Sequence, residues 1–173
     1  MISIQDKSQK ILLLSILILV AIFSRLMPHP PNFTAIAAVA LFAGAHFRSR
    51  ILAFLVPFIA MIISDLTIGL HNTLIPVYAA FAISVGIGIY ISEKKSPKLI
   101  VSGALASSVL FFLITNLAVW LAGGMYPMNF SGLMLCYAAA IPFFQNTLAG
   151  DLFFTGLLFG SYYLLSNKLF LVR

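Results

Sequence analysis

Long apolar runs alternate with short polar breaks along the chain, and the lengths of these runs predict transmembrane helices. A helix needs about 20 apolar residues to cross the roughly 30 Å hydrocarbon core of a bilayer. Six segments reach or approach that length: 11–27, 33–47, 51–68, 74–92, 99–121 and 142–165. The segment 130–140 is too short to span, so we expect a partial helix there, before the last span. The pattern predicts an all-α integral membrane protein, with six transmembrane helices in a single domain covering residues 1–173.

The second of these segments is shorter than the others. At about 1.5 Å per residue, a helix over 33–47 falls short of the hydrocarbon core. It follows the turn PHPPN at 28–32, whose prolines suit a helix start because they need no hydrogen-bond partner for a backbone N–H. We therefore expect this helix to begin below the outer membrane surface or to extend through its loops.

Composition supports membrane insertion. The chain of 173 residues is 62% hydrophobic and 8% charged, whereas soluble domains carry about 25% charged residues. Such a chain cannot cover a water-facing surface, which excludes the soluble classes. After the first apolar run, Ser24-Arg25-Leu26 stands where a signal peptide would have a small-residue cleavage site, so we expect the first helix to be retained.

The basic residues are distributed asymmetrically. Cytoplasmic loops of membrane proteins carry an excess of lysine and arginine. With the N-terminus in the cytoplasm, the inner segments would hold Lys7, Lys10, Arg48, Arg50, Lys94, Lys95, Lys98, Lys168 and Arg173. Only Arg25 would lie on the other side. This asymmetry predicts that both termini lie in the cytoplasm. It also explains the net charge of +6 by the lipid bilayer as partner, with no nucleic acid.

Polar side chains gather at the outer ends of the predicted helices. A charged group at membrane depth costs roughly 2.5–3.5 kcal/mol and usually lines a cavity or pairs with another charge. Helices 2, 4 and 6 would also start at the outer face, which directs three positive dipole ends there. These ends would favour a ligand with an anionic or carbonyl-rich edge. The sequence thus predicts an outward-facing pocket for a small-molecule substrate. The candidate substrate-binding residues are Arg25, Asp65, His71, Asn116, Trp120, Asn146 and Asp151.

Each charged candidate has a structural alternative. Asp65 could contact ligand or could pair with Arg25 to hold two helices together. Asp151 lies four residues after Thr147, on the same helix face, and could bind ligand or form a buried structural hydrogen bond. His71 could bind a ligand or metal, or could be a solvated loop histidine.

The uncharged candidates also have two interpretations each. Asn116 and Trp120 share a helix face, where Trp120 could stack on a flat ligand or act as an interfacial anchor. Asn146 could contact substrate or cap the last helix. Cys136 is expected to be a small apolar filler.

No motif for catalysis stands out. The chain has no H-E-x-x-H, G-x-S-x-G or G-x-x-x-x-G-K pattern, and we expect no cofactor and no metal site. The segment NFSG at 129–132, with Ser131 and either His29 or His71 as a base, is a weak match to the serine motif of intramembrane proteases. The chain is therefore not expected to be an enzyme.

Four stretches resemble a family of small, uncharacterised bacterial membrane proteins that are described as transport proteins. They are PHPPNFTAIAAVALFAGAHF, ISDLTIGLH, TNLAVWLAGGMYP and CYAAAIPFFQNTLAGDLFFTGLLFG. The resemblance covers most of the chain from Arg25 to Gly160. That family is more remotely similar to the S components of energy-coupling-factor (ECF) vitamin transporters, including the solitary cobalamin-binding type.

The resemblance implies a six-helix bundle with both termini inside and a ligand pocket near the outer face. It also implies uptake of a vitamin-sized molecule and an ATPase-driven energising module as a partner. In the cobalamin-binding type a cysteine holds the cobalt, and here Cys136 or His71 would have to take that part. Two other functions stay open: a small membrane enzyme acting on a lipid or peptide at the outer leaflet, and a non-transporting membrane scaffold.

Overall fold

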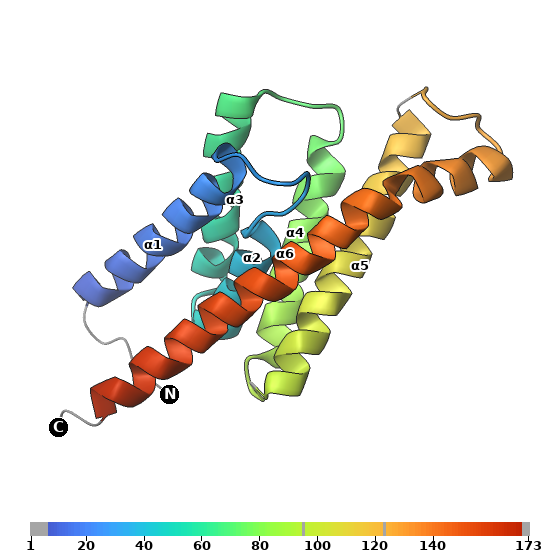
Figure 1. Ribbon diagram of the computed structural model, residues 1–173. Helices are drawn as coiled ribbons and strands as arrows, with labels where there is room; N and C mark the ends of the chain where they lie inside the picture. The colour runs from blue at the N-terminus through green and yellow to red at the C-terminus, as the bar shows by residue number, and fades with distance from the viewer. Residues whose placement is uncertain (1–6, 95, 123, 171–173) are drawn as a thin grey trace.

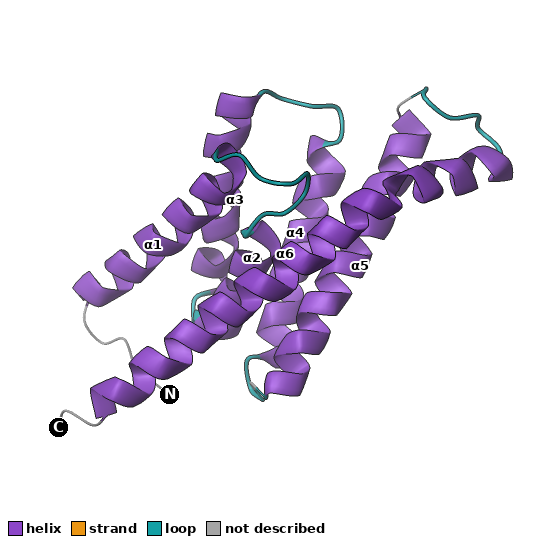
Figure 2. Ribbon diagram, in the orientation of Figure 1, coloured by secondary structure: helices purple, strands orange, loops and turns teal. Residues whose placement is uncertain are grey.

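The computed structural model describes the backbone of residues 7–94, 96–122 and 124–170 and the side chains of 11–94, 96–122 and 124–165. Within these ranges the chain forms helices and no strands (Figure 2). The helices are α1 (Lys7–Leu26), α2 (Ile36–His46), α3 (Arg50–Ile68), α4 (Leu74–Ile91), α5 (Pro97–Ala122) and α6 (Phe130–Phe170) (Figure 1). Lys95, Arg173 and the side chains of Lys7, Lys10 and Lys168 lie outside the described residues.

Four of these helices, α3 to α6, are long and apolar enough to span a membrane. The apolar part of α1, Ile11–Leu26, is shorter, and so is α2. The all-helical, membrane-type fold is confirmed, while six crossings and cytoplasmic termini stay predictions.

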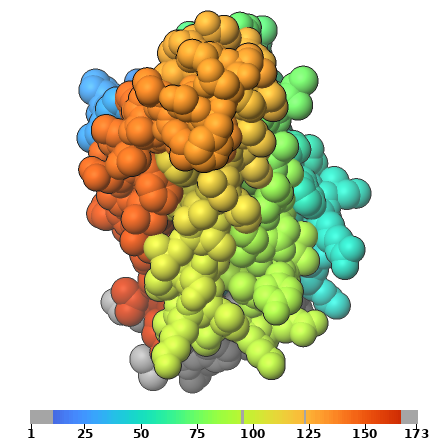
Figure 3. Space-filling model, turned by 90° about the vertical axis from the view of Figure 1, so that its right-hand side faces the viewer, coloured from blue at the N-terminus to red at the C-terminus, as the bar shows by residue number. Residues whose placement is uncertain are grey.

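One side of α5 is an exposed apolar surface. Its exposed stripe repeats every four residues through Leu105, Val109, Leu113, Leu117 and Leu121, which are 38–57% exposed. Figure 3 shows this face, with α5 (yellow to orange) between α4 (green) and the later part of α6 (orange to red). An apolar stripe of this length on the outside of a bundle is suited to a hydrocarbon environment.

Helix α2 forms the centre of the bundle. All ten residues from Ile36 to Ala45 are buried. With 11 residues, the helix is about 16 Å long at 1.5 Å per residue and cannot cross a bilayer alone. Its close packing depends on Gly44, because a Cβ there would overlap the backbone of Val85 and Gly88 on α4. The loop before it descends into the bundle (Figure 1). The depth of this helix below a membrane surface stays a prediction.

Helix α6 corrects the prediction for the C-terminal region. The expected partial helix 130–140 and the expected span 142–165 form one continuous helix of 41 residues that passes through Pro142. Proline removes only one backbone donor, and such a gap is tolerated within packed transmembrane helices. Gly132 does not interrupt the helix either: its N–H donates to Asn129 Oδ1, 2.8 Å away, which caps the first turn. Figure 1 shows α6 bending in its early, orange part and then crossing the bundle obliquely, and proline is the usual cause of such a bend.

The loops sort to the two ends of the bundle as the charge pattern predicts. The connections 27–35, 69–73 and 124–129 lie at the upper end in Figure 1, and those at 47–49 and 92–94 lie toward the lower end. The lower connections and the helix ends beside them carry Arg48, Arg50, Lys94 and Lys98, all exposed. The grouping of polar and basic connections is therefore consistent with the positive-inside rule.

Candidate functional site

A cavity of about 590 Å³ lies among the upper parts of the helices. Residues from all six helices and from the loops before α2 and α4 line it. Its size falls within the range of about 300–1,000 Å³ typical of small-molecule sites. The polar residues that line it are Arg25, His29, Asn32, Thr34, His71, Thr73, Thr115, Asn116, Thr147 and Asp151.

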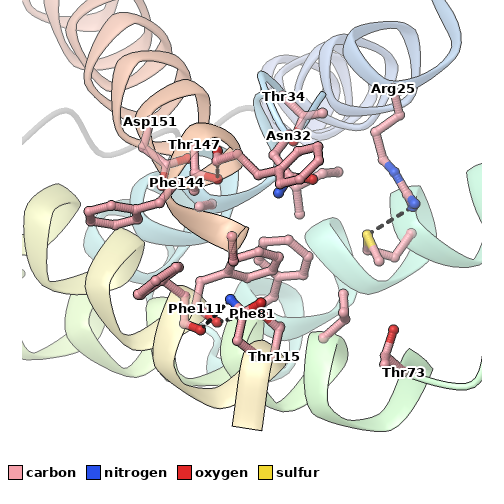
Figure 4. A pocket seen from close by; sticks show the side chains of 18 of the residues that line it. Arg25, Asn32, Thr34, Thr73, Phe81, Phe111, Thr115, Phe144, Thr147 and Asp151 are labelled. Carbon is pink, nitrogen blue, oxygen red and sulfur yellow. Dashed lines mark hydrogen bonds between the residues drawn. The ribbon is translucent and has the colours of Figure 1, made fainter. Parts of the chain in front are cut away.

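Four of the seven predicted site residues meet at this cavity. They are Arg25, His71, Asn116 and Asp151. Figure 4 shows Arg25 and Asp151 on opposite sides of the cavity. The other three, Asp65, Trp120 and Asn146, are not among the residues that line it.

Arg25 extends into the cavity from the last turn of α1, and residues of α3 bind its guanidinium on the side away from the cavity. Its Nη1 lies 2.7 Å from Asp65 Oδ1 and donates to Ser64 Oγ over 2.6 Å. The same atom lies 3.0 Å from Met61 Sδ, the contact drawn in Figure 4. Tyr78 of α4 donates to Asp65 Oδ2 over 2.9 Å. Of the two roles considered for Asp65, the structure shows the pairing with Arg25.

Asp151 lies on the cavity wall formed by α6 and is 3% exposed. Ser108 of α5 donates to its Oδ2 over 2.6 Å, and the Ser108 Oγ also lies 3.0 Å from the Ala104 carbonyl. The single hydroxyl hydrogen therefore serves two acceptors. Within the described part of the chain, Asp151 forms no ion pair. A carboxylate at this depth with one shared donor has little of its charge compensated.

Gly150, which precedes Asp151, packs closely against the loop before α2. A Cβ at Gly150 would lie 3.1 Å from Phe33 Cα and 3.2 Å from the Thr34 nitrogen, so only a residue without a side chain fits there comfortably. Ile36 and Ala37, the first residues of α2, line the cavity. The positive end of the α2 dipole therefore lies at the cavity wall.

The dipole argument made from the sequence holds for α2 and α4 and is wrong for α6. Thr73, the N-cap residue of α4, lines the cavity. Helix α6 begins at Phe130, which is not part of the lining. Asn146 consequently lies in the middle of a helix and cannot cap it, because the helix continues through Pro142.

Three polar side chains on the wall donate back to their own helices. Thr115 Oγ1 donates to the Phe111 carbonyl over 2.8 Å, and Thr147 Oγ1 donates to the Phe143 carbonyl over 3.0 Å. Asn116 Nδ2 donates to the Phe112 carbonyl over 2.8 Å. Each group uses a donor in this way and keeps its acceptor oxygen for a ligand. The sequence analysis noted Thr147 because it lies four residues before Asp151 on the same helix face. It did not identify Thr115.

Aromatic rings form much of the remaining wall. Phe81 and Phe111 pack with their ring centroids 5.2 Å apart, and Phe112 and Phe144 with theirs 4.7 Å apart. Figure 4 shows Phe144 beside Asp151, with Phe111 and Phe81 on the opposite wall. The sequence analysis missed these rings because phenylalanine in a membrane protein gives no sign of whether it faces lipid, core or cavity.

The remaining candidates have structural partners. Trp120 Nε1 donates to the Pro127 carbonyl over 2.9 Å, which ties the end of α5 to the loop before α6. His71, exposed at the cavity rim, lies with Nδ1 2.9 Å from Thr73 Oγ1. Cys136 is buried, and its Sγ is 3.5 Å from the Asn116 carbonyl. Among the described residues, no three His, Cys, Asp or Glu side chains cluster as metal ligands.

A family model matches residues 5–172, which is nearly the whole chain. It describes DUF6580, a family of unknown function. The chain belongs to the DUF6580 family. No curated protein matches the chain. No solved structure matches it either.

The cavity of this DUF6580 member offers three kinds of contact to a small molecule. Toward the other described residues, the Arg25 side chain bonds through Nη1, so its Nε and Nη2 keep their donors for a ligand. On the opposite side Asp151 and its neighbouring hydroxyls offer acceptors, and the paired rings offer flat apolar surface. Few, well-placed polar groups in an otherwise apolar pocket are typical of ligand binding.

Proposed function

We propose that this protein binds a vitamin-sized small molecule in the 590 Å³ cavity and takes it up across a bacterial inner membrane. The observation that carries the proposal is the enclosure of buried Asp151, Arg25 and two aromatic pairs in one cavity at a single end of a membrane-type bundle. Intramembrane ionisable groups that line a cavity usually mark a substrate path.

The mode of transport is proposed from the resemblance in the sequence. As in S components, the protein would bind its substrate from the outer side and release it inward by tilting or with an ATPase-driven energising module. The charge distribution supports the orientation, because the exposed basic residues Arg48, Arg50, Lys94 and Lys98 lie at the end of the bundle away from the cavity.

The test is native mass spectrometry of the full chain purified in mild detergent. We expect a bound small molecule in stoichiometric amount, which is absent from a folded Asp151→Ala variant and retained in Ser131→Ala. Ser131 is exposed in the first turn of α6 and is not part of the cavity lining, so it is a matched control. Protein that carries no bound small molecule after growth in rich and minimal media would contradict the proposal.

A transport assay separates uptake from binding alone. The identified ligand, in radiolabelled form, is added to cells that produce the wild-type protein or Asp151→Ala. Accumulation that depends on Asp151 supports uptake. Binding without accumulation would instead favour a membrane scaffold or sensor.

A further inference from the structure

We infer that the ligand of this cavity is an organic molecule of net positive charge, whose cationic nitrogen lies against Asp151 among the aromatic rings. The inference rests on the proposed function, since it assigns the chemical class of the molecule that the cavity holds. It follows from three independent features of the wall: the charge balance, the direction of the hydrogen bonds and the placement of the rings.

The ionisable side chains leave the cavity with a net negative charge. The positive dipole ends of α2 and α4, which underlay the expectation of an anionic or carbonyl-rich ligand edge, also lie at the wall but carry only partial charges. Arg25 is neutralised by Asp65, which lies 2.7 Å away and outside the cavity lining. Asp151 has no such partner among the described residues, and its one donor is the shared hydroxyl of Ser108. A buried charge is stable only with a counter-charge and hydrogen bonds. A ligand cation would supply the missing counter-charge, whereas an anion would add a second negative charge.

The hydrogen bonds around Asp151 point the same way. Thr147, one helical turn before Asp151, donates its only hydroxyl hydrogen to the Phe143 carbonyl. Thr115 on α5 does the same toward the Phe111 carbonyl. The oxygens that remain free can only accept, so this wall fits a ligand rich in donors. An ammonium or a protonated ring nitrogen has donors and no competing acceptor.

The aromatic rings suit a cation as well. Phe112 and Phe144 form one pair and Phe81 and Phe111 a second pair, and all four line the cavity. A cation within about 6 Å of a ring centroid is attracted by the electron-rich ring face. Figure 4 shows Phe144 adjacent to Asp151, so one bound group can contact both the carboxylate and a ring. A carboxylate beside phenylalanine rings favours an organic cation over a hydrated inorganic one.

The test separates ligands by charge. A water-soluble extract of a bacterium that carries this gene is divided by ion exchange at pH 7 into cationic, neutral and anionic fractions. Each fraction is added to the detergent-purified full chain, from which bound small molecules have been washed, and the thermal unfolding midpoint is measured. We expect only the cationic fraction to raise the midpoint, by several degrees. We expect the same rise in the Ser131→Ala control.

The variant Asp151→Asn then tests the residue. It keeps the shape and the hydrogen bond from Ser108 but removes the charge, so we expect at least a tenfold loss of affinity for the active cationic fraction. Thr147→Val removes one acceptor without changing the charge and should weaken binding severalfold. If Asp151→Asn does not fold, Thr147→Val tests this wall of the cavity in its place.

Each other outcome is decisive. Stabilisation by the neutral or anionic fraction alone would overturn the cation assignment and leave the proposed function standing. Equal protection of wild type and Asp151→Asn by the cationic fraction would overturn the role of Asp151. If no fraction stabilises the protein, both the inference and the proposed binding function are wrong.

Discussion

Asp65 lies directly behind Arg25, with its Oδ1 2.7 Å from Arg25 Nη1, and neutralises the guanidinium from outside the cavity. Asp65 does not line the central cavity. Together with Tyr78 it lines a second, smaller groove between α3 and α4. The pair thus forms part of the partition between the central cavity and the outside of the bundle. Arg25 contributes donors to the cavity while its charge is already balanced.

Breaking this pair should destabilise the protein strongly. In Asp65→Asn the Arg25 guanidinium, 15% exposed, loses its counter-charge. Removal of one partner from a buried ion pair costs about 3–5 kcal/mol. Tyr78→Phe removes only the hydrogen bond to Asp65 Oδ2, so it should cost about 1–3 kcal/mol. The measurement is thermal unfolding in detergent, followed by circular dichroism.

The double variant Arg25→Met/Asp65→Leu is the control for this experiment. Replacement of a whole buried pair by apolar residues is often close to neutral, so it should be more stable than Asp65→Asn. If Asp65→Asn unfolds at the wild-type temperature, the pair is not the structural element that its geometry indicates.

The contact between α2 and α4 gives a second prediction. A Cβ at Gly88 would overlap the Leu41 carbonyl and the backbone at Gly44, and backbone atoms cannot move aside as a flexible side chain can. Gly88→Ala should therefore cost at least about 1–3 kcal/mol, the usual cost of overpacking. Gly86→Ala, two residues away on the same helix, meets nothing within 4 Å and should leave stability unchanged or slightly raised.

Size-exclusion yield and thermal unfolding of the two glycine variants provide the measurement. If Gly88→Ala is as stable as Gly86→Ala, α2 and α4 do not pack as closely at Gly88 as the structure indicates.

The sequence predicted the coarse architecture because hydrophobic run length alone determines it. The starts of α3 and α4 were correct within one residue, since polar turns interrupt the apolar pattern there. Helix α6 was predicted in two pieces because Pro142 is usually a helix breaker in water, whereas packing against α5 retains the helix here.

The cavity lining was predictable in part where it is polar, and not where it is aromatic. Arg25 and Asp151 stood out because charge is costly at membrane depth, and both do line the cavity. Phe112 and Phe144 gave no signal, since nothing in an apolar sequence distinguishes a ring that faces a cavity from one that faces lipid. Trp120 was proposed to stack on a flat ligand because it shares a helix face with Asn116. The structure places it outside the cavity lining, with its N–H donating to the Pro127 carbonyl.

The aromatic wall gives a third prediction. Phe144→Ala should weaken ligand binding at least tenfold, because it removes a ring from the cavity and from its pair with Phe112. Trp120→Phe should change affinity less than twofold, because Trp120 is not part of the lining. Affinity is measured by equilibrium dialysis with the ligand identified by mass spectrometry.

Phe130→Ala is the matched control for the ring substitution. Phe130 is 76% exposed at the start of α6 and is not part of the cavity lining, so its loss should not affect binding. A loss of binding in Trp120→Phe that equals the loss in Phe144→Ala would restore the stacking role considered for Trp120.

The orientation in the membrane gives the last prediction. In a Cys136→Ser background, single cysteines replace Met128 in the α5–α6 loop and Ser96 in the α4–α5 loop, both exposed. Because the loop at Ser96 lies next to the basic residues Lys94 and Lys98, it should face the cytoplasm. A membrane-impermeant maleimide should therefore label Met128→Cys in intact cells and Ser96→Cys only after lysis. Labelling of Ser96→Cys in intact cells would place the cavity on the cytoplasmic side, and uptake from outside through an outward-facing pocket would then be untenable.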